Sequence, residues 1–254
     1  MTSLEIREIK PGDSEWPARL SDLGDKAPER LFVRGIDITG LFDKSVSIVG
    51  ARAATSYGEH VAMEFASELS TRGFTIVSGA AYGIDGAAHR AAVAAGGKTI
   101  AFLAGSVDRM YPAGHAHLGE RIMQRGALIS ENPPGSEPTK YRFLERNRLI
   151  AAASQGSVIV EAGWRSGSLN EAGHAVNLGR PLGAVPGPVT SAASMGSHRL
   201  IREEGAVCIT STDDIVNMLL CPRHGGAWGD DVTCQECTDL NGEPRSRRKK
   251  DGQS

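Results

Sequence analysis

The chain has 254 residues, 40% of them hydrophobic, which is enough for one large domain with a substantial core. The formal net charge is −2, so a uniformly basic surface is excluded and any nucleic-acid site on the main body must be a local basic patch. No stretch reaches the ~18 apolar residues of a membrane span, and the polar N-terminus lacks the apolar core of a signal peptide, which predicts a cytoplasmic protein with no membrane partner.

The first 44 residues predict a short N-terminal extension that packs on the core. Its expected packing residues are Trp16, Pro17, Leu20, Leu31, Phe32 and Val33. From residue 45 to residue 219, short apolar runs alternate with helical patterns, which is typical of a parallel sheet covered on both faces. The predicted strands are 46–50, 74–78, 98–104, 127–130, 157–161, 182–185 and 206–209.

Helical patterns lie between these strands. Val61, Phe65 and Leu69 recur every four residues after the first strand, and an alanine-rich segment, 84–97, follows the second and ends at a glycine pair. This alternation predicts an α/β fold, an extended Rossmann-like, doubly wound and mostly parallel sheet. Such sheets bind ligands beyond the C-terminal ends of their strands, so functional residues should directly follow the strands.

The loop after the first predicted strand, residues 50–58, has the features of an anion site. Gly50 permits a tight turn, Arg52 projects a positive charge, and Thr55 or Ser56 can cap the following helix. A helix N-terminus beside an arginine attracts anions. A simple strand–helix turn with a solvated Arg52 explains this loop equally well.

The loop after the second predicted strand, residues 78–89, predicts a cradle for phosphate. Gly79 and Gly83 let backbone N–H groups come close to a phosphate, but their spacing does not fit the G-x-G-x-x-G of a dinucleotide site. We therefore favour phosphate over NAD. His89 is expected to pack within its helix rather than to act as a catalyst.

Three further strand ends carry polar residues. Arg109 follows the third strand and can contact phosphate or form a salt bridge with Asp108 or another neighbour. Glu161 ends the fifth strand and is expected to anchor backbone N–H groups rather than to act as an acid or base. Gly167 and Ser168 begin a helix, which predicts a second anion-binding N-terminus.

Residues 140–154, KYRFLERNRLIAAAS, interleave basic and aromatic side chains. A run of charges is usually a solvated face, but here Tyr141 and Phe143 lie among four cations, Lys140, Arg142, Arg146 and Arg148. Unpaired bases require this combination, because cations follow the backbone and a ring stacks on a base for ~1–3 kcal/mol. Asn147 can order the segment or hydrogen-bond a base.

Six motifs in order, from about Trp16 to Leu219, resemble the DprA/Smf family of DNA-processing proteins. They are GxR, SGxAxGID with AH shortly after it, GGKTIAxLAGxxDxxYP, FxxRNRxIxAxS, VExxxxSGSL and GRPLxAVPGPVTS. The resemblance implies an extended Rossmann fold, single-stranded DNA binding without an established enzymatic activity, a homodimer, and loading of the RecA recombinase during natural transformation.

By resemblance, Arg52 is a main phosphate contact, Lys140 is a second one, and Phe143 is a base-stacking ring. The loops 78–79 and 166–168 supply backbone and hydroxyl donors. The predicted DNA-binding residues are therefore Arg52, Ser78, Gly79, Gly83, Arg109, Lys140, Phe143, Arg146, Asn147, Arg148, Ser166, Gly167 and Ser168. The core domain is expected to need no cofactor.

The chain departs from the family pattern at Glu171. Many members read SGSLxTA, whereas this sequence has Asn170, Glu171 and Ala172 after the same start. The segment also looks like the GTxxE of LOG-type nucleotide hydrolases, in which the glutamate acts on the N-glycosidic bond of a nucleoside monophosphate. Trp164-Arg165-Ser166 stands where those enzymes have a glycine pair, so the hydrolase is the alternative and DNA binding the prediction.

The C-terminal segment has metal-like spacing. Cys221-x2-His224 and Cys234-x2-Cys237 predict one Cys₃His zinc knuckle within residues 220–238, although a chance spacing is the alternative. Residues 239–254 predict a disordered basic tail, which with the knuckle would form a second nucleic-acid contact. Cys208 is expected in the core.

Overall fold

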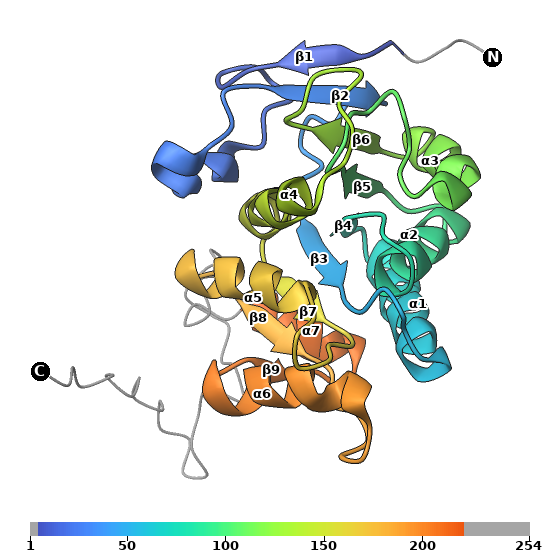
Figure 1. Ribbon diagram of the computed structural model, residues 1–254, viewed down its shortest axis with the longest axis vertical. Coiled ribbons are helices and arrows are strands. Elements are labelled where there is room, and N and C mark those ends of the chain that lie inside the picture. Colours follow the sequence, from blue (N-terminus) through green and yellow to red (C-terminus); the bar gives the residue numbers. More distant parts are fainter. Residues whose placement is uncertain (1–4, 221–254) are drawn as a thin grey trace, which may run out of the picture.

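The computed structural model describes residues 5–220, within which a single nine-stranded sheet carries helices on both faces (Figure 1). The strand order is β1-β2-β6-β5-β4-β3-β7-β8-β9. The strands are β1 (Arg7–Ile9), β2 (Leu31–Gly35), β3 (Ser45–Val49), β4 (Thr75–Ser78), β5 (Thr99–Phe102), β6 (Ala127–Ser130), β7 (Ser157–Ile159), β8 (Leu182–Ala184) and β9 (Val207–Cys208).

The sheet is parallel from β6 to β9, and only the edge formed by β1 and β2 is antiparallel. This confirms the predicted α/β fold with a mostly parallel sheet, and each of the seven predicted strands is present. The N-terminal residues add two strands to the same sheet, since Phe32 of β2 pairs with Ser130 of β6.

Helices cover both faces of the sheet. One face carries α1 (Ser56–Thr71), α2 (Ile84–Ala94), α3 (Ala116–Met123) and α7 (Thr212–Leu220). The other carries η1 (Ala18–Lys26), α4 (Lys140–Ala153), α5 (Ser168–Asn177) and α6 (Met195–Glu203), and short turns of 3₁₀ helix, η2 (Ala113–His115) and η3 (Ala192–Ser194), precede α3 and α6. Within these helices, none is long and apolar enough to cross a membrane.

Alternation along each strand divides the core into two layers. Ile76 of β4 packs with Phe65 of α1, whereas its neighbour Val77 packs on the opposite face with Leu149 of α4. Adjacent strand side chains point to opposite faces, so a run without polar residues is buried on both sides. The continuous apolar runs in the sequence have this physical origin.

Glu161 fixes the entry into α1 from a distant part of the chain. Its buried carboxylate accepts hydrogen bonds from the Thr55 backbone N–H (2.8 Å) and from Thr55 Oγ1 (2.6 Å). Thr55 in turn caps α1 by accepting from the Gly58 N–H. The prediction that Glu161 anchors backbone N–H groups is confirmed, and the anchor places the loop that carries Arg52.

Two expectations about single residues have different outcomes. His89 is fully buried in α2, with Nδ1 2.7 Å from Thr99 Oγ1, and burial together with nearby positive groups lowers its pKa to about 3, which confirms a packing role. The expectation for Cys208 is wrong, because this cysteine is exposed. It lies in the two-residue strand β9 at the edge of the sheet, where a side chain in an apolar run can remain exposed to solvent.

The order of the strands creates a switch point between β3 and β7. From β3 the chain builds β4, β5 and β6 on one side, then returns through α4 to place β7 on the other side of β3. The loop after β3 leads to α1 on one face, and the loop after β7 leads to α5 on the opposite face. Loops that diverge in this way leave a crevice at the strand ends.

Candidate functional site: a pocket at the switch point

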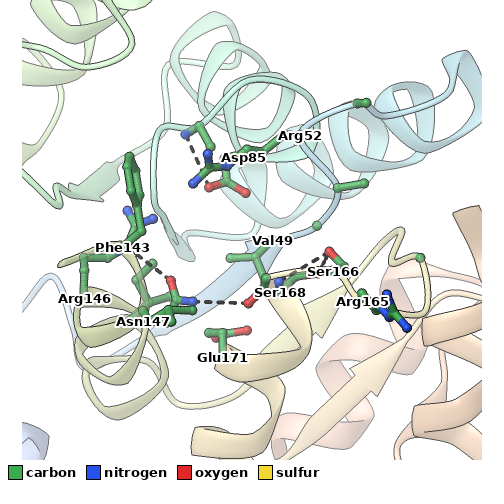
Figure 2. Close-up of a pocket in the computed structure, with 18 of the residues that line it drawn as sticks. Val49, Arg52, Asp85, Phe143, Arg146, Asn147, Arg165, Ser166, Ser168 and Glu171 are labelled. Atoms are coloured by element: carbon green, nitrogen blue, oxygen red, sulfur yellow. Dashed lines mark hydrogen bonds between the residues drawn. The ribbon is translucent and has the colours of Figure 1, made fainter. Parts of the chain in front are cut away.

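A pocket of about 490 Å³ occupies this crevice (Figure 2). Its walls come from the loop after β3, the start of α2, residues 143–150 of α4, and the loop between β7 and α5. The charged residues that line it are Arg52, Asp85, Arg146, Arg165 and Glu171. The pocket lies at the strand ends, where the sequence predicts functional residues, and β3 and β7 are the strands whose following loops line it.

The guanidinium of Arg52 stacks on the aromatic ring of Phe143. The guanidinium carbon lies 4.4 Å from the centroid of the Phe143 ring, and Tyr111 packs against the same ring with 5.7 Å between centroids. Across residues 5–220, no hydrogen bond or ion pair engages the exposed Arg52 side chain. A guanidinium held by stacking keeps its N–H donors available, so Arg52 is free to bind an anion.

The start of α5 supplies polar groups on the opposite side of the pocket. Gly167 precedes the helix, as predicted, and the Ser166 hydroxyl accepts from the first N–H of the helix, that of Ser168 (3.4 Å). Ser166 Oγ and Ser168 Oγ lie 2.7 Å apart, and both residues line the pocket. Asn147 ties α4 to this turn, since its Nδ2 donates to Gly167 O (3.3 Å) and to Asn170 Oδ1 (3.2 Å). The N-terminus of a helix favours negative charge nearby.

Arg146 lies in the floor of the pocket rather than on the surface. It is buried, and its Nη1 donates to Gly79 O (2.7 Å) and to Phe102 O. Burial lowers its pKa to about 10, although Asp85 acts in the opposite direction. A side chain at position 79 would collide with this guanidinium, so the approach of Arg146 requires a glycine at this position.

Two other predicted DNA contacts are structural. Ser78 is buried, and its hydroxyl donates to Ile48 O (2.7 Å). Arg148 is also buried and binds Glu131 through two hydrogen bonds of 2.9 and 2.6 Å. Its Nε donates to Lys26 O, which links α4 to η1. We correct both predictions, because side chains that are buried and fully engaged have no surface to offer to DNA.

The remaining predicted residues, Gly83, Arg109 and Lys140, are not part of the pocket lining. Gly83 has φ +72° and packs its backbone against that of Ala51, which positions the start of α2. Arg109 is exposed and pairs with Glu137 (2.7 Å), which is the salt-bridge alternative. Lys140 is exposed at the first turn of α4, outside the pocket lining.

Sequence reasoning assigned no role to two charged residues of the pocket. Arg165 is exposed, lines the pocket and adds a second surface cation; its signal was a basic residue directly before Ser166-Gly167-Ser168. Asp85 lies in the first turn of α2 and is buried. Burial raises the pKa of Asp85, while Arg146 and the backbone N–H groups of Ala81, Gly50 and Gly79 act against that rise.

Glu171 is the least exposed of the charged residues that line the pocket. Its Oε1 accepts hydrogen bonds from Ser47 (2.9 Å) and Ser157 (2.8 Å), which are paired neighbours on β3 and β7. Among the described residues, its Oε2 has no hydrogen-bond partner. Burial raises the pKa of this carboxyl to about 7, and the nearby Asp85 adds to the effect. The carboxyl therefore gains or loses its proton near neutral pH.

Comparison with known proteins identifies the family. The family model for DNA recombination-mediator protein A matches residues 7–220. The chain belongs to this family. It is 50% identical over 224 residues to a putative DNA processing protein DprA of Mycobacterium tuberculosis and 41% identical over 216 residues to the protein Smf of Escherichia coli. Each alignment covers 84% of this chain but only 57% of the relative, so the chain spans little more than half of their length.

Solved DprA structures share the fold. The Streptococcus pneumoniae protein superposes with a TM-score of 0.77 at 36% identity, covering 84% of this chain and 74% of that one. The Helicobacter pylori protein superposes with a TM-score of 0.76 at 30% identity, covering 85% and 96%. The family resemblance predicted from ordered motifs is thereby confirmed.

A metal is not suggested by the described residues. Across positions 5–220, no group of three or more His, Cys, Asp or Glu side chains is placed to hold a metal ion. The predicted zinc ligands Cys221, His224, Cys234 and Cys237, and the predicted basic tail, lie outside the described residues.

The substitution Glu171→Gln should remove a pH dependence of stability. Between pH 4.5 and about 7 the folded state keeps a proton that the unfolded state releases, so wild-type stability falls as pH rises through this window and levels off above it. The Gln variant lacks this loss, and at pH 8 it should be more stable than wild type by up to about 3 kcal/mol.

Urea unfolding between pH 5 and pH 8 measures the effect, with Glu64→Gln on the exposed face of α1 as the control. Parallel profiles for wild type and Glu171→Gln would contradict the buried, titrating carboxyl.

Proposed function

We propose that this pocket binds the phosphate backbone of single-stranded DNA and that the chain processes DNA for recombination. The observation that carries the proposal is the position of Arg52, which stacks on Phe143 with its donors free, across the pocket from the start of α5. The Arg52 guanidinium and the N-terminus of α5, which both attract phosphate, thus line the same pocket. The family is described as a recombination mediator, and the Helicobacter pylori relative is described by its single-stranded DNA binding mode.

The aromatic residues beside Arg52 favour a single strand over a duplex. Phe143 is half-buried and Tyr111 is exposed, so together they offer ring surface next to the phosphate site. Bases can stack on such rings only when they are unpaired, and a duplex presents only its backbone and groove edges. We infer that the pocket holds a phosphate while adjacent bases contact these rings.

Family membership extends the proposal to partners. We propose that the strand-bound chain acts as a homodimer in the cytoplasm, protects incoming DNA and loads a RecA-type recombinase onto it. Because the chain spans 57% of the two relatives named above, these partners need their own test. Co-sedimentation of a RecA-type recombinase with the strand-bound protein tests the recombinase contact. The mass of the protein in solution tests the homodimer.

The substitution Arg52→Ala should weaken binding of a short labelled single strand at least ~tenfold, since a charge-assisted phosphate contact of about 1.4 kcal/mol is lost. Fluorescence anisotropy at several salt concentrations measures the affinity, and wild type should prefer the single strand to its duplex. Arg72→Ala is the matched control. This exposed arginine lies between the end of α1 and the start of β4, so it is at the opposite end of the strands from the pocket. Equal affinities of wild type and Arg52→Ala would reject the phosphate site.

A nucleotide hydrolase is the second candidate, favoured by the raised pKa of Glu171 in the pocket. A carboxyl that titrates near neutral pH can act as a general acid or base, which contributes ~10²–10⁴ in rate. The hydrolase predicts release of a free base from at least one of the four nucleoside monophosphates, abolished in Glu171→Ala. Inactivity of the wild-type protein toward all four would eliminate it.

We also propose, on sequence spacing alone, that Cys221, His224, Cys234 and Cys237 bind one zinc ion and that the adjoining basic residues contact nucleic acid. Protein purified without chelators should contain about one equivalent of zinc, as a Cys₃His set requires. Deletion of residues 221–254 should weaken DNA binding and reduce its salt dependence. The absence of zinc would refute the knuckle, and unchanged affinity after the deletion would refute the DNA contact.

A further inference from the structure

The buried carboxyl of Glu171 lies in the same pocket as two exposed arginines, Arg52 and Arg165. Glu171 is only 1% exposed and lines the pocket from the first turn of α5, and Gly167 and Ser168 at the start of that helix line the same pocket. Two serines hold Oε1, whereas Oε2 has no partner within residues 5–220. Figure 2 shows Glu171 below Ser168 at the base of the site, with Arg52 and Phe143 above it.

The charges around Glu171 come close to balance when it is neutral. Asp85 from α2 and Arg146 from α4 are the charged groups that act on it, and both are buried. Ser47 from β3 and Ser157 from β7 complete its surroundings without charge. When Asp85 is ionised, the form that Arg146 and the backbone N–H groups around it favour, it offsets Arg146, and an ionised Glu171 then leaves a net negative floor under the site.

A negatively charged pocket floor and a bound phosphate repel each other, and the charges of the floor are buried. Interactions between charges are strong where burial lowers the effective dielectric constant. A phosphate bound near Arg52 and the start of α5 therefore favours the protonated form of Glu171. By linkage, protonated Glu171 must favour the phosphate to the same extent.

We propose that Glu171 is a specificity-determining residue that couples anion binding in this pocket to uptake of one proton, so that the pocket holds a phosphodiester tightly only while the carboxyl is neutral. The inference rests on the proposed function, because it assumes that the ligand is a phosphodiester bound at the rim. It adds that affinity declines on the alkaline side of neutrality. The raised pKa of Glu171, about 7, places the transition in an accessible range.

The direction of the effect follows from the linkage. Below the transition both the free and the bound protein carry the proton, and affinity is constant. Above it the free protein has lost the proton that the complex keeps, so affinity falls by up to ~tenfold per pH unit, the limit for one proton. A phosphodiester does not titrate in this range, so the change must come from the protein.

The experiment compares wild type, Glu171→Gln and Glu64→Gln in their affinity for an oligothymidylate without a terminal phosphate, from pH 6 to pH 8.5 at constant ionic strength. Wild type and Glu64→Gln should bind about tenfold more weakly at pH 8.5 than at pH 6, a change that corresponds to one pKa unit of coupling. Glu171→Gln, which is neutral throughout, should change less than about threefold and bind more tightly than wild type at pH 8.5.

Calorimetry of the wild-type protein gives a readout that does not depend on any variant. Titrations at pH 7.5 in two buffers with different ionisation enthalpies should report proton uptake on binding. Uptake is expected even if Glu171→Gln fails to fold. Zero uptake would overturn the proposal.

The outcomes separate this inference from the proposed function. Binding that is tight at pH 6 and equally tight at pH 8.5 rejects the coupling and leaves the DNA site intact. A pH dependence that persists in Glu171→Gln also rejects it, since the titrating group is then another residue, such as the half-buried His174 on α5. No binding of the oligonucleotide at any pH rejects the DNA site and the coupling together.

Discussion

The buried guanidinium of Arg146 is the interaction on which the site depends. It joins α4 to the ends of two strands, β4 and β5, through the carbonyl groups of Gly79 and Phe102. Taking a cation out of water is costly unless it is paired and hydrogen-bonded, and Asp85 together with these carbonyl groups meets that requirement. With Arg146 in place, α4 lies along the pocket and brings Phe143 under Arg52.

The same arrangement explains how a chain with a net negative charge can offer an anion site. The two acidic residues that line the pocket, Asp85 and Glu171, are both buried near Arg146, and burial raises the pKa of each. Arg52 and Arg165 lie exposed at the rim, where their charge reaches solvent. Local burial, rather than the sum of charges, decides the sign of the field that a ligand meets.

The basic segment from Lys140 to Ala153 shows why a run of charges is difficult to interpret in isolation. As a helix, α4 turns Arg146 and Arg148 inward and leaves Lys140 and Tyr141 exposed. One inward arginine supports the pocket floor, and the other binds Glu131 and holds η1. Residues that are adjacent in the sequence therefore have unrelated roles, because successive helical positions differ by about 100° in direction.

The sequence by itself determined the α/β class, the positions of seven strands and the family, because periodicity and ordered motifs are local properties of the chain. It also selected Arg52, Phe143 and Ser166–Ser168 as DNA-binding residues, and these line one pocket. Only the tertiary structure decided that Ser78 and Arg148 are engaged inside the core, that Arg165 joins the rim, and that Cys208 is exposed. Burial and pairing depend on which distant segments meet, and the return of the chain through α4 to β7 sets that outcome.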